Sequence, residues 1–413
     1  MDLKEEVALY QQLRFEQDCT PKIDISILDE QSLKSLLLKL KKDRVSPDEP
    51  NSLEGIISSS KFETINLSID KYEERIKGAI VGRFAGCLLG VPVEGYSIER
   101  MENIAKTGNT PFPPTEYWHK VDQEENIQYG VDLRGNYTLS KMNAVFVDDD
   151  ITYTVLNLIL LERYYANYTV ENIGQLWLDI LPYACTAEDC AIKELKAGIE
   201  PKNVANNNPF IEWIGAAIRA DAFGYVFAGR PHLAARVAYN DAYLTHRRNG
   251  IYGEMFLAAA IALSFKLHPL EAIKKAIDYI PSKSRLHKDI EWALSFEGKD
   301  INFREARKLI DERFPGMNSV HTNNNMCVIT FIAMMAGDSY TNAISQCVAM
   351  GLDNDCTAAS IGSMFGAYYT IQGIEEKWYK CFNNNVHTYL KGYENIKLTE
   401  IFKLAIKLYH NNL

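Results

Sequence analysis

The stretch Gly78-Ala-Ile-Val-Gly-Arg-Phe-Ala-Gly-Cys-Leu-Leu-Gly90 decides the fold, because glycine interrupts its apolar residues at every fourth position. Residues four apart lie on one face of a helix. A glycine face lets a second backbone come close, or leaves room for a ligand near the helix end. Residues 358–367 carry a similar series of alanine and glycine. Both stretches predict closely packed helices, and for any single glycine packing without a ligand is the simpler interpretation.

The chain after residue 68 continues as a succession of helical patterns. Apolar residues recur at helical spacing, whereas the alternating pattern of strands is scarce. We therefore predict an all-α fold with a compact multi-helix body. The predicted helices span residues 70–89, 151–165, 170–184, 209–227, 231–243, 253–265, 270–280, 284–296, 303–314, 325–335, 340–350, 357–371 and 398–409.

The first 65 residues are predicted to form a helical appendage. Amphipathic patterns predict short helices over residues 5–17 and 29–43. The stretch Val45-Ser-Pro-Asp-Glu-Pro-Asn-Ser52 is rich in proline and acidic residues, which predicts a linker. We place the boundary between residues 45 and 70. This gives an N-terminal helical appendage and linker at 1–65 and a main body at 66–413.

Composition argues against several classes of protein. With 413 residues, a net charge of -10 and an isoelectric point near 5.4, the chain should not attract nucleic acid or anionic membranes, a local basic patch aside. Its 8 cysteines lack the density of a disulfide scaffold. We recognise neither a signal peptide nor a membrane-spanning stretch. We therefore expect a cytoplasmic protein with reduced thiols, whose partner is a small molecule or another protein.

Two acidic clusters predict a metal site. Asp148, Asp149 and Asp150 stand directly before a long apolar run, where a helix N-terminus stabilises one or two carboxylates. Three crowded negative charges repel one another unless water or a cation screens them, and hard cations such as Mg²⁺ select oxygen ligands. Asp353 and Asp355 repeat the pattern before a small-residue helix. An Asx-turn with an N-cap explains either cluster alone, whereas the pair favours one shared metal site.

Three sequence motifs, in a fixed order along the chain, together indicate a known family. They are Ile80-Val-Gly-Arg-Phe-Ala-Gly-Cys-Leu-Leu-Gly-Val-Pro-Val-Glu94, Asp148-Asp-Asp-Ile-Thr-Tyr-Thr154 and Gly351-Leu-Asp-Asn-Asp-Cys-Thr-Ala-Ala-Ser-Ile-Gly362. Together they resemble the ADP-ribosylglycohydrolase family, which includes the dinitrogenase reductase-activating glycohydrolases and the ADP-ribosyl-acceptor hydrolases. The resemblance runs from about residue 72 to about residue 380. The appendage lies outside it.

This resemblance implies an ADP-ribosylglycohydrolase-like all-α body with a binuclear Mg²⁺ or Mn²⁺ centre. The family's ligand sets fall on Asp148, Asp149 and Asp150 and on Asp353, Asp355 and Cys356. Asp148 offers a carboxylate where many members have a hydroxyl, which should still coordinate. Cys356 replaces a hydroxyl with a thiol, a poor match for Mg²⁺. We leave open whether Thr357 or water takes that place, and whether the second metal position is filled.

The resemblance also implies a catalytic role for Glu94. Glu94 follows a turn that Pro92 fixes. Without the resemblance, an ordinary surface glutamate is the favoured interpretation of this residue. In the family the matching glutamate acts in acid/base catalysis beside the metals, so Glu94, Asp149 and Asp150 form the expected catalytic set. Cleavage of an ADP-ribosyl bond needs oriented ribose hydroxyls, a proton donor and an activated water. We expect a monomeric hydrolase that releases ADP-ribose from a modified protein or a small ADP-ribose conjugate.

Four more residues are candidates for binding substrate. Gly215 and Ala216 match the small-residue stretch where the family approaches the pyrophosphate, and His246 falls where the family places a histidine near the substrate. Asn323, at an asparagine-rich helix start, can bind ribose or an acceptor. A packed helix start, a structural histidine and an asparagine cap are the respective alternatives. The loop-like residues 95–145 are the expected source of linkage specificity.

Two other functions stay open at this point. All-helical isoprenoid synthases also hold Mg²⁺ between acidic motifs, but Thr152 and Tyr153 occupy the positions where their DDxxD pattern needs aspartate. The second alternative is a non-catalytic module of the immunity type that binds ADP-ribose or a partner protein. The appendage motivates it, because amphipathic helices joined by a linker can dock over a cleft.

Overall fold

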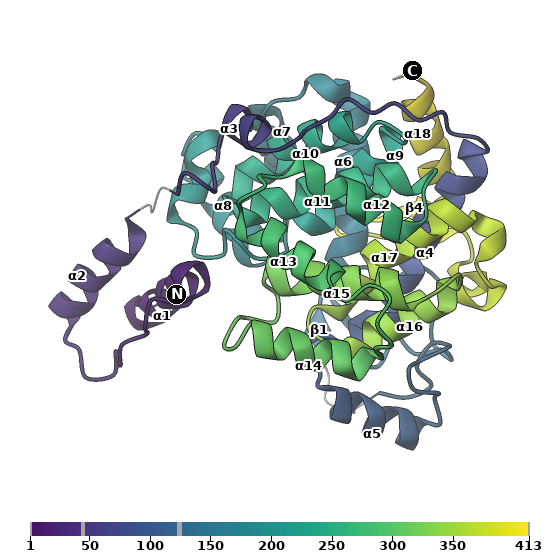
Figure 1. The fold of residues 1–413 in the computed structure, drawn as a ribbon, viewed down its shortest axis with the longest axis horizontal. Helices are drawn as coiled ribbons and strands as arrows, with labels where there is room; N and C mark the ends of the chain where they lie inside the picture. Colours follow the sequence, from purple (N-terminus) through teal and green to yellow (C-terminus); the bar gives the residue numbers. More distant parts are fainter. Residues whose placement is uncertain (1, 43–45, 122–125, 412–413) are drawn as a thin grey trace.

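The computed structural model describes residues 2–42, 46–121 and 126–411 and confirms the all-α prediction (Figure 1). The helices are α1 (Leu3–Asp18), α2 (Glu30–Lys41), α3 (Leu53–Ser59), α4 (Tyr72–Gly90), α5 (Ile98–Gly108), α6 (Asp149–Tyr164), α7 (Val170–Ile180), α8 (Thr186–Lys196), α9 (Asp221–Val226), α10 (Pro231–Thr245), α11 (Asn249–Ser264), α12 (Pro269–Ala276), α13 (Arg285–Leu294), α14 (Phe303–Arg313), α15 (Thr322–Met335), α16 (Tyr340–Met350), α17 (Asn354–Tyr369) and α18 (Leu398–Asn411).

Shorter elements connect these helices. The 3-10 helices are η1 (Val91–Val93), η2 (Tyr165–Asn167), η3 (Pro201–Asn207), η4 (Ala217–Arg219), η5 (Ile277–Tyr279), η6 (Ile371–Gly373), η7 (Glu376–Trp378) and η8 (Lys380–Phe382). Two antiparallel ribbons pair β1 (Ile127–Gln128) with β2 (Val131–Asp132) and β3 (Asn385–His387) with β4 (Asn395–Lys397). The strands are short and lie beside the helical body, so the fold class is unchanged.

Helices α4 and α17 lie so close together that their backbones touch. A Cβ atom added at Gly82 would lie 2.3 Å from the carbonyl oxygen of Gly362. The two helices run antiparallel, because Gly90 at the end of α4 lies beside Asp355 in the first turn of α17. The glycines in these two stretches therefore permit close packing. That packing brings the chain that leaves α4 next to the chain that enters α17.

One continuous core surrounds this helix pair. Helix α11 is buried along its whole length, and α6 is buried from Asp150 to Leu161. Helix α4 is long and apolar enough to cross a membrane by length and composition alone, and its candidate span reaches Val93. However, 94% of the most apolar window is buried among the other helices. Helix α4 therefore has the burial of a core helix.

Two predicted segments differ from the structure. Residues 209–227, predicted as one helix, form turns, η4 and the short α9. The reason is tertiary: Trp213 pairs with His321 in an isolated antiparallel β-bridge, which a continuous helix would not allow. Residues 95–145, predicted as a loop, contain α5 and the ribbon β1–β2. Helix α3 and helix α8 also have no counterpart among the predicted helices.

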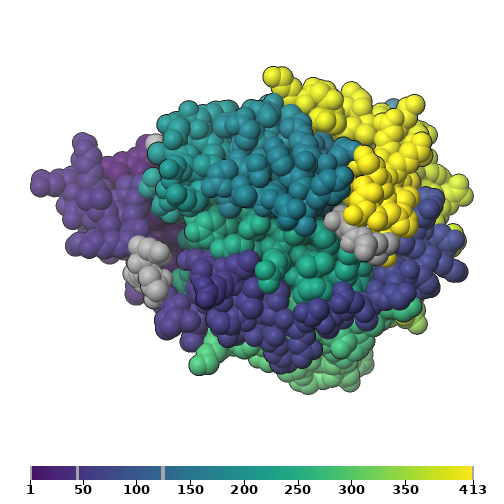
Figure 2. Space-filling model, turned by 90° about the horizontal axis from the view of Figure 1, so that it is seen from above, coloured from purple at the N-terminus to yellow at the C-terminus, as the bar shows by residue number. Residues whose placement is uncertain are grey.

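The N-terminal extension, taken here as the described residues before 68, packs in two ways. Helices α1 and α2 share a small core of their own, made by Val7, Tyr10, Leu13, Leu33 and Leu40. After residue 46 the chain lies across the surface of the body (Figure 2). There the N–H of Phe62 donates to the carbonyl of Asp278 at 2.9 Å. The predicted end of the second helix at Asp43 and the first linker residue, Val45, lie outside the described residues.

Glu49, in the predicted linker, is buried in the body. Its side chain is 5% exposed, and its carboxylate forms an ion pair with Arg248, whose Nε lies 2.7 Å away. The carboxylate also accepts hydrogen bonds from the side-chain amide of Asn249 (3.1 Å) and the backbone N–H of Arg285 (2.9 Å). This part of the predicted linker is therefore docked on the body by a buried charge.

The end of helix α1 is also bound to the body. The carboxylate of Glu16 accepts hydrogen bonds from the backbone N–H of Asn318 (2.8 Å) and from the indole N–H of Trp213 (3.3 Å). The side-chain amide of Gln17 donates to the carboxylate of Glu212 at 2.7 Å. Glu16 and Gln17 are both buried. These contacts fix helix α1 to the loop that carries Trp213.

The α4–α17 contact yields a first prediction. We expect Gly82→Ala to lower the free energy of unfolding by about 1–3 kcal/mol, because its methyl group would force the two backbones apart. Gly174→Ala in α7 is the matched control, since its nearest new contacts are side-chain atoms at 3.1 Å and alanine favours a helix. Chemical denaturation followed by circular dichroism measures both. Equal losses in the two variants would contradict this account.

A second prediction concerns Glu49. We expect Glu49→Ala to destabilise the protein by about 1–3 kcal/mol, because the buried guanidinium of Arg248 loses its hydrogen-bonded carboxylate and keeps only Glu212, 3.6 Å away. Glu54→Ala, an exposed glutamate in the neighbouring helix α3, should change stability by less than about 0.5 kcal/mol. Urea titrations of both variants give the comparison. If Glu49→Ala were as stable as Glu54→Ala, the segment would be resting on the body rather than anchored by its charge.

Candidate active site

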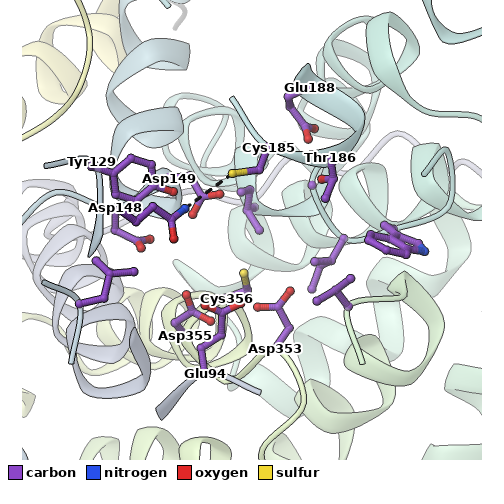
Figure 3. A pocket seen from close by; sticks show the side chains of 17 residues that line it. Glu94, Tyr129, Asp148, Asp149, Cys185, Thr186, Glu188, Asp353, Asp355 and Cys356 are labelled. Atoms are coloured by element: carbon purple, nitrogen blue, oxygen red, sulfur yellow. Dashed lines mark hydrogen bonds between the residues drawn. The ribbon is translucent and has the colours of Figure 1, made fainter. Parts of the chain in front are cut away.

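A cavity of about 140 Å³ opens where the chain leaves α4 and where helices α6 and α17 begin. The predicted site residues that line it are Glu94, Asp148, Asp149, Gly215, Asp353, Asp355 and Cys356. Figure 3 shows Asp148 and Asp149 on one side of this space and Glu94, Asp353, Asp355 and Cys356 on the opposite side. The fold thus brings together the two acidic clusters, which are about two hundred residues apart in the sequence.

The first cluster begins helix α6. Asp148 is the N-cap, and its Oδ1 accepts a hydrogen bond from the backbone N–H of Asp150 at 3.0 Å. The same oxygen accepts a second hydrogen bond from the thiol of Cys87 on α4, at 3.2 Å. Asp149 and Asp150 occupy the first turn. A capping role accounts for one of the three carboxylates, which leaves the other two for a further purpose.

Arg83 of α4 holds Asp150 from behind. Its guanidinium lies 2.8 Å from Asp150 Oδ1 and 2.6 Å from Asp221 Oδ2, and all three side chains are fully buried. It also donates to the carbonyl of Ile218 at 2.6 Å. Asp150 Oδ2 has no hydrogen-bond partner among the described residues. One oxygen of Asp150 is therefore bound to Arg83, and the other is available to the cluster.

Glu94 sits on a turn that is tied to the second cluster. The N–H of Gly95 donates to the carbonyl of Leu352 at 3.1 Å, and the side-chain amide of Asn354 donates to the carbonyl of Val93 at 3.4 Å. Leu352 has a φ of 64°, a left-handed conformation that side chains other than glycine adopt at a cost. The strained loop before α17 and the turn after α4 thus form one unit.

The second cluster begins helix α17. The backbone carbonyl of Asp353 accepts from the N–H of Thr357 (3.0 Å) and from its hydroxyl (2.9 Å). Asp353 and Asp355 are both 4% exposed, and one carboxylate oxygen of each lacks a partner among the described residues. Thr357 is bound to this carbonyl and fully buried, so its hydroxyl is already engaged. Cys356 is the side chain at this position that lines the cavity.

The donor set fits divalent cations. Three groups each bring three ligand atoms within 4.8 Å of one another: Asp148 with Asp149 and Asp150, Glu94 with Asp353 and Asp355, and Asp150 with Asp355 and Cys356. Buried oxygens without partners are costly unless an ion or water satisfies them. Carboxylates are the ligands that Mg²⁺ and Mn²⁺ prefer. The fit rests on these unpartnered oxygens and not on charge alone.

The cluster raises the pKa values of its own carboxyl groups. The negative charge of Asp355, followed by burial, raises the pKa of Glu94 to about 8. Burial is the main cause that raises the pKa of Asp150 and that of Asp355 to about 7 each. Burial also raises the pKa values of Asp148 and Asp353 well above the ordinary range. Without a cation the cluster therefore retains protons at neutral pH.

Three of the predicted substrate-binding residues do not line the cavity. Ala216, His246 and Asn323 are fully buried in the packing beside it. His246 Nδ1 lies 2.6 Å from the hydroxyl of Thr245, and the Asn323 amide donates to Asp289 at 2.7 Å. These two side chains are thus engaged in structural contacts, so the structural alternatives describe them better than direct binding does.

Gly215 lines the cavity, as predicted, but its surroundings are acidic. A Cβ atom at Gly215 would lie 2.6 Å from the carboxylate oxygens of Glu188, which also lines the cavity. Arg219 lies 2.5 Å from Glu188 and neutralises it in part. A pyrophosphate directly against Gly215 would meet this carboxylate, which makes the position unfavourable for an anion.

Sequence reasoning missed several lining residues. Tyr129, Cys185, Thr186 and Glu188 border the same cavity (Figure 3). Cys185 is the N-cap of α8, and Thr186 follows it with a φ of 41°. Helix α8 was absent from the predicted elements, so the sequence offered no position for these side chains. Acidic residues near the start of this segment, Glu188 and Asp189, and lysines near its end, Lys193 and Lys196, are the signals that could have indicated the helix.

Comparison with known proteins shows the family of this chain. The profile of the ADP-ribosylglycohydrolase family matches residues 68–411. An uncharacterized protein of Archaeoglobus fulgidus (strain ATCC 49558) is 24% identical over 345 residues, which cover 82% of this chain and 96% of that protein. A solved structure titled "ADP-ribosylglycohydrolase-related protein complex" shares the fold, with a TM-score of 0.51, 17% identity and coverage of 83% of this chain and 99% of that one. The family match spans most of the sequence, and the chain therefore belongs to the ADP-ribosylglycohydrolase family.

Proposed function

We propose that this protein is a metal-dependent hydrolase that cleaves the glycosidic bond of an ADP-ribosyl adduct and releases ADP-ribose. The adduct is carried by a protein or by a small conjugate. Family membership indicates glycohydrolase activity of this general type. The observation that carries the finer proposal is that the predicted carboxylates Glu94, Asp148, Asp149, Asp353 and Asp355 converge on one cavity.

The size and charge of the cavity favour the ribose end of the substrate. The cavity of about 140 Å³ is lined by several carboxylates as well as apolar side chains, and carboxylates accept hydrogen bonds from sugar hydroxyls and repel phosphate groups. We therefore assign the cavity to the ribose whose anomeric bond breaks. The pyrophosphate would lie nearer the mouth, away from Glu188 and Gly215.

The side chains have distinct roles in this proposal. Divalent ions held by Asp148, Asp149, Asp353 and Asp355 would orient ribose hydroxyls and make a bound water more acidic. Glu94 faces the same space, where its carboxyl group can give a proton to the leaving atom. As a carboxylate, it can then accept a proton from the attacking water.

Asp150 has a holding role. Arg83 occupies one of its oxygens and neutralises part of its charge, so Asp150 is poorly placed to exchange protons with solvent. One of its carboxylate oxygens lies within 4.8 Å of ligand atoms of Asp355 and Cys356. We therefore assign Asp150 to ion binding and leave proton transfer to Glu94. This divides the predicted catalytic set of Glu94, Asp149 and Asp150 by function.

The activity assay is a third prediction. With Mg²⁺ or Mn²⁺, the purified protein should release ADP-ribose from at least one of ADP-ribosylated arginine, ADP-ribosylated serine and O-acetyl-ADP-ribose, as chromatography detects it. Glu94→Gln should reduce the rate by about 10²–10⁴-fold, because it removes the proton donor and leaves the size of the side chain unchanged. Asp353→Asn should abolish stimulation by metal.

Asp300→Asn, an exposed loop carboxylate, is the control and should retain the wild-type rate. Equal rates in wild type, Glu94→Gln and Asp353→Asn on every substrate would refute the proposed mechanism. Tight binding of ADP-ribose without turnover on any substrate would favour the non-catalytic binding module instead.

The raised pKa values give a fourth prediction. Between pH 6.5 and 8 the folded, metal-free protein holds protons on Asp150, Asp355 and Glu94 that the unfolded chain has already lost. Stability should therefore fall as the pH rises through this window. Burial lowers the pKa values of His246 and His321, which act in the opposite direction, but this effect fades above about pH 6.5, where histidine in the unfolded chain loses its own proton.

Thermal unfolding of the EDTA-treated protein at pH 6.5 and 8 measures this change. Added Mg²⁺ or Mn²⁺ should stabilise more at pH 8, because cations and protons compete for the same oxygens. Asp355→Asn should weaken both trends, since Asp355 has a raised pKa and also raises that of Glu94. A metal-free protein that gains stability from pH 6.5 to 8 would show that these carboxyl groups are not protonated.

A further inference from the structure

Cys356 is the one sulfur donor among the grouped ligand atoms of the described residues. It lies in the first turn of α17, next to Asp355, and it lines the cavity. Its side chain is 6% exposed. Its sulfur lies within 4.8 Å of a carboxylate oxygen of Asp150 and of one of Asp355, and those two oxygens also lie within 4.8 Å of each other. Three donors of two chemical kinds thus surround one small volume.

The two carboxylates of this group have oxygens to spare. Asp150 Oδ1 is bound to Arg83 at 2.8 Å, whereas Asp150 Oδ2 has no hydrogen-bond partner among the described residues. Asp355 Oδ1 is likewise buried without a partner. Buried acceptors of this kind call for a cation or an ordered water. Burial raises the pKa of Asp150, and the hydrogen-bonding influence of the Cys356 thiol lowers it, so the thiol and this carboxylate already lie beside the same volume.

We propose that Asp150, Asp355 and Cys356 form a site for a thiophilic divalent ion of the zinc class. Thiolate ligands select zinc-like ions, whereas Mg²⁺ is a hard ion that prefers oxygen. Two carboxylates and one thiolate leave a fourth position open, the ligand count of catalytic rather than structural zinc sites. The inference rests on the proposed metal centre and specifies which ion it takes at this position.

The neighbouring group gives the centre two unlike halves. Asp353 and Asp355, beside Glu94, offer oxygen atoms alone and suit Mg²⁺ or Mn²⁺. Asp355 belongs to both groups and can bridge them. The centre therefore pairs a hard ion with a thiophilic ion, and Cys356 determines which position takes which. Binding at the thiophilic position breaks the S–H bond of Cys356, forms a sulfur–metal bond and releases the proton to the buffer.

Cobalt(II) is the probe, because thiolate ligation gives it an intense near-ultraviolet charge-transfer band that oxygen ligands do not produce. Full-length wild-type protein with Co²⁺ should show this band. Cys356→Ser should lose it, while Cys381→Ser, a half-buried thiol outside the cavity lining, should keep it. Loss of the band in Cys185→Ser and its retention in Cys356→Ser would assign the sulfur ligand to the other cavity thiol and overturn the proposal.

Competition binding gives the second measurement. Zn²⁺ affinity should fall by about tenfold or more in Cys356→Ser, since even the loss of an outer partner of a ligand typically costs that much. Mg²⁺ affinity should change little. Equal losses of Zn²⁺ and Mg²⁺ affinity would contradict the selective role of the thiol.

X-ray absorption of the zinc-loaded wild type keeps the test valid if Cys356→Ser does not fold. It should detect one sulfur at about 2.3 Å beside oxygen ligands at about 2.0–2.2 Å. A zinc shell without sulfur would overturn the inference. Magnesium-dependent hydrolysis with no cobalt–sulfur band would overturn this inference alone, whereas no binding of any divalent ion would overturn the proposed metal dependence as well.

Discussion

The backbone contact between helices α4 and α17 is the constraint on which the rest of the molecule depends. Side chains on the facing surfaces would hold the helix axes apart, and glycine at Gly82 and Gly362 removes them. The gain is positional: the turn that carries Glu94 and the loop that carries Asp353 hydrogen-bond to each other across this contact. The shared site is therefore a product of helix packing and would not survive a shift of one helix along the other.

The second constraint is electrostatic. Carboxylates that crowd a buried space oppose folding unless something offsets their charge. Arg83 offsets part of it at Asp150 and Asp221, and protons offset more, as the raised pKa values of Glu94 and Asp355 indicate. When a cation binds, it relieves the repulsion between the carboxylates that destabilises the empty site, and this relief contributes to the affinity for the cation. The same electrostatic repulsion therefore lowers the stability of the metal-free protein and strengthens its binding of a cation.

Much of this was visible in the sequence because the signals are contiguous. The glycine spacing, the two acidic runs and the position of Glu94 each occupy a few neighbouring residues, so local pattern and family resemblance sufficed to bring them into one prediction. The all-α fold followed from helical periodicity. Cys356 lies inside one of these contiguous motifs, so the sequence alone identified it as a thiol at a ligand position and indicated that it suits Mg²⁺ poorly.

What the sequence could not supply depends on distant partners. Arg83 forms ion pairs with Asp150 and Asp221, and nothing in the sequence around Arg83 indicates these distant partners. His246 and Asn323 matched plausible positions, yet tertiary packing turned both toward structural neighbours. The region 209–227 looked helical, but the bridge between Trp213 and His321 overrode its propensity. In each case a contact between distant segments decided the outcome.

The docked segment around Glu49 limits which substitutions the extension and the body can accept during evolution. The family match begins at residue 68, yet Arg248 and Glu212, inside the matched body, are paired with Glu49 and Gln17, outside it. A relative that lacks such an extension must satisfy those buried charges by other means or carry different residues there. Substitutions at the paired positions of the extension and the body should therefore depend on each other. The folded unit also extends beyond the region that matches the family, because the contacts of Glu49 and Gln17 lie before residue 68.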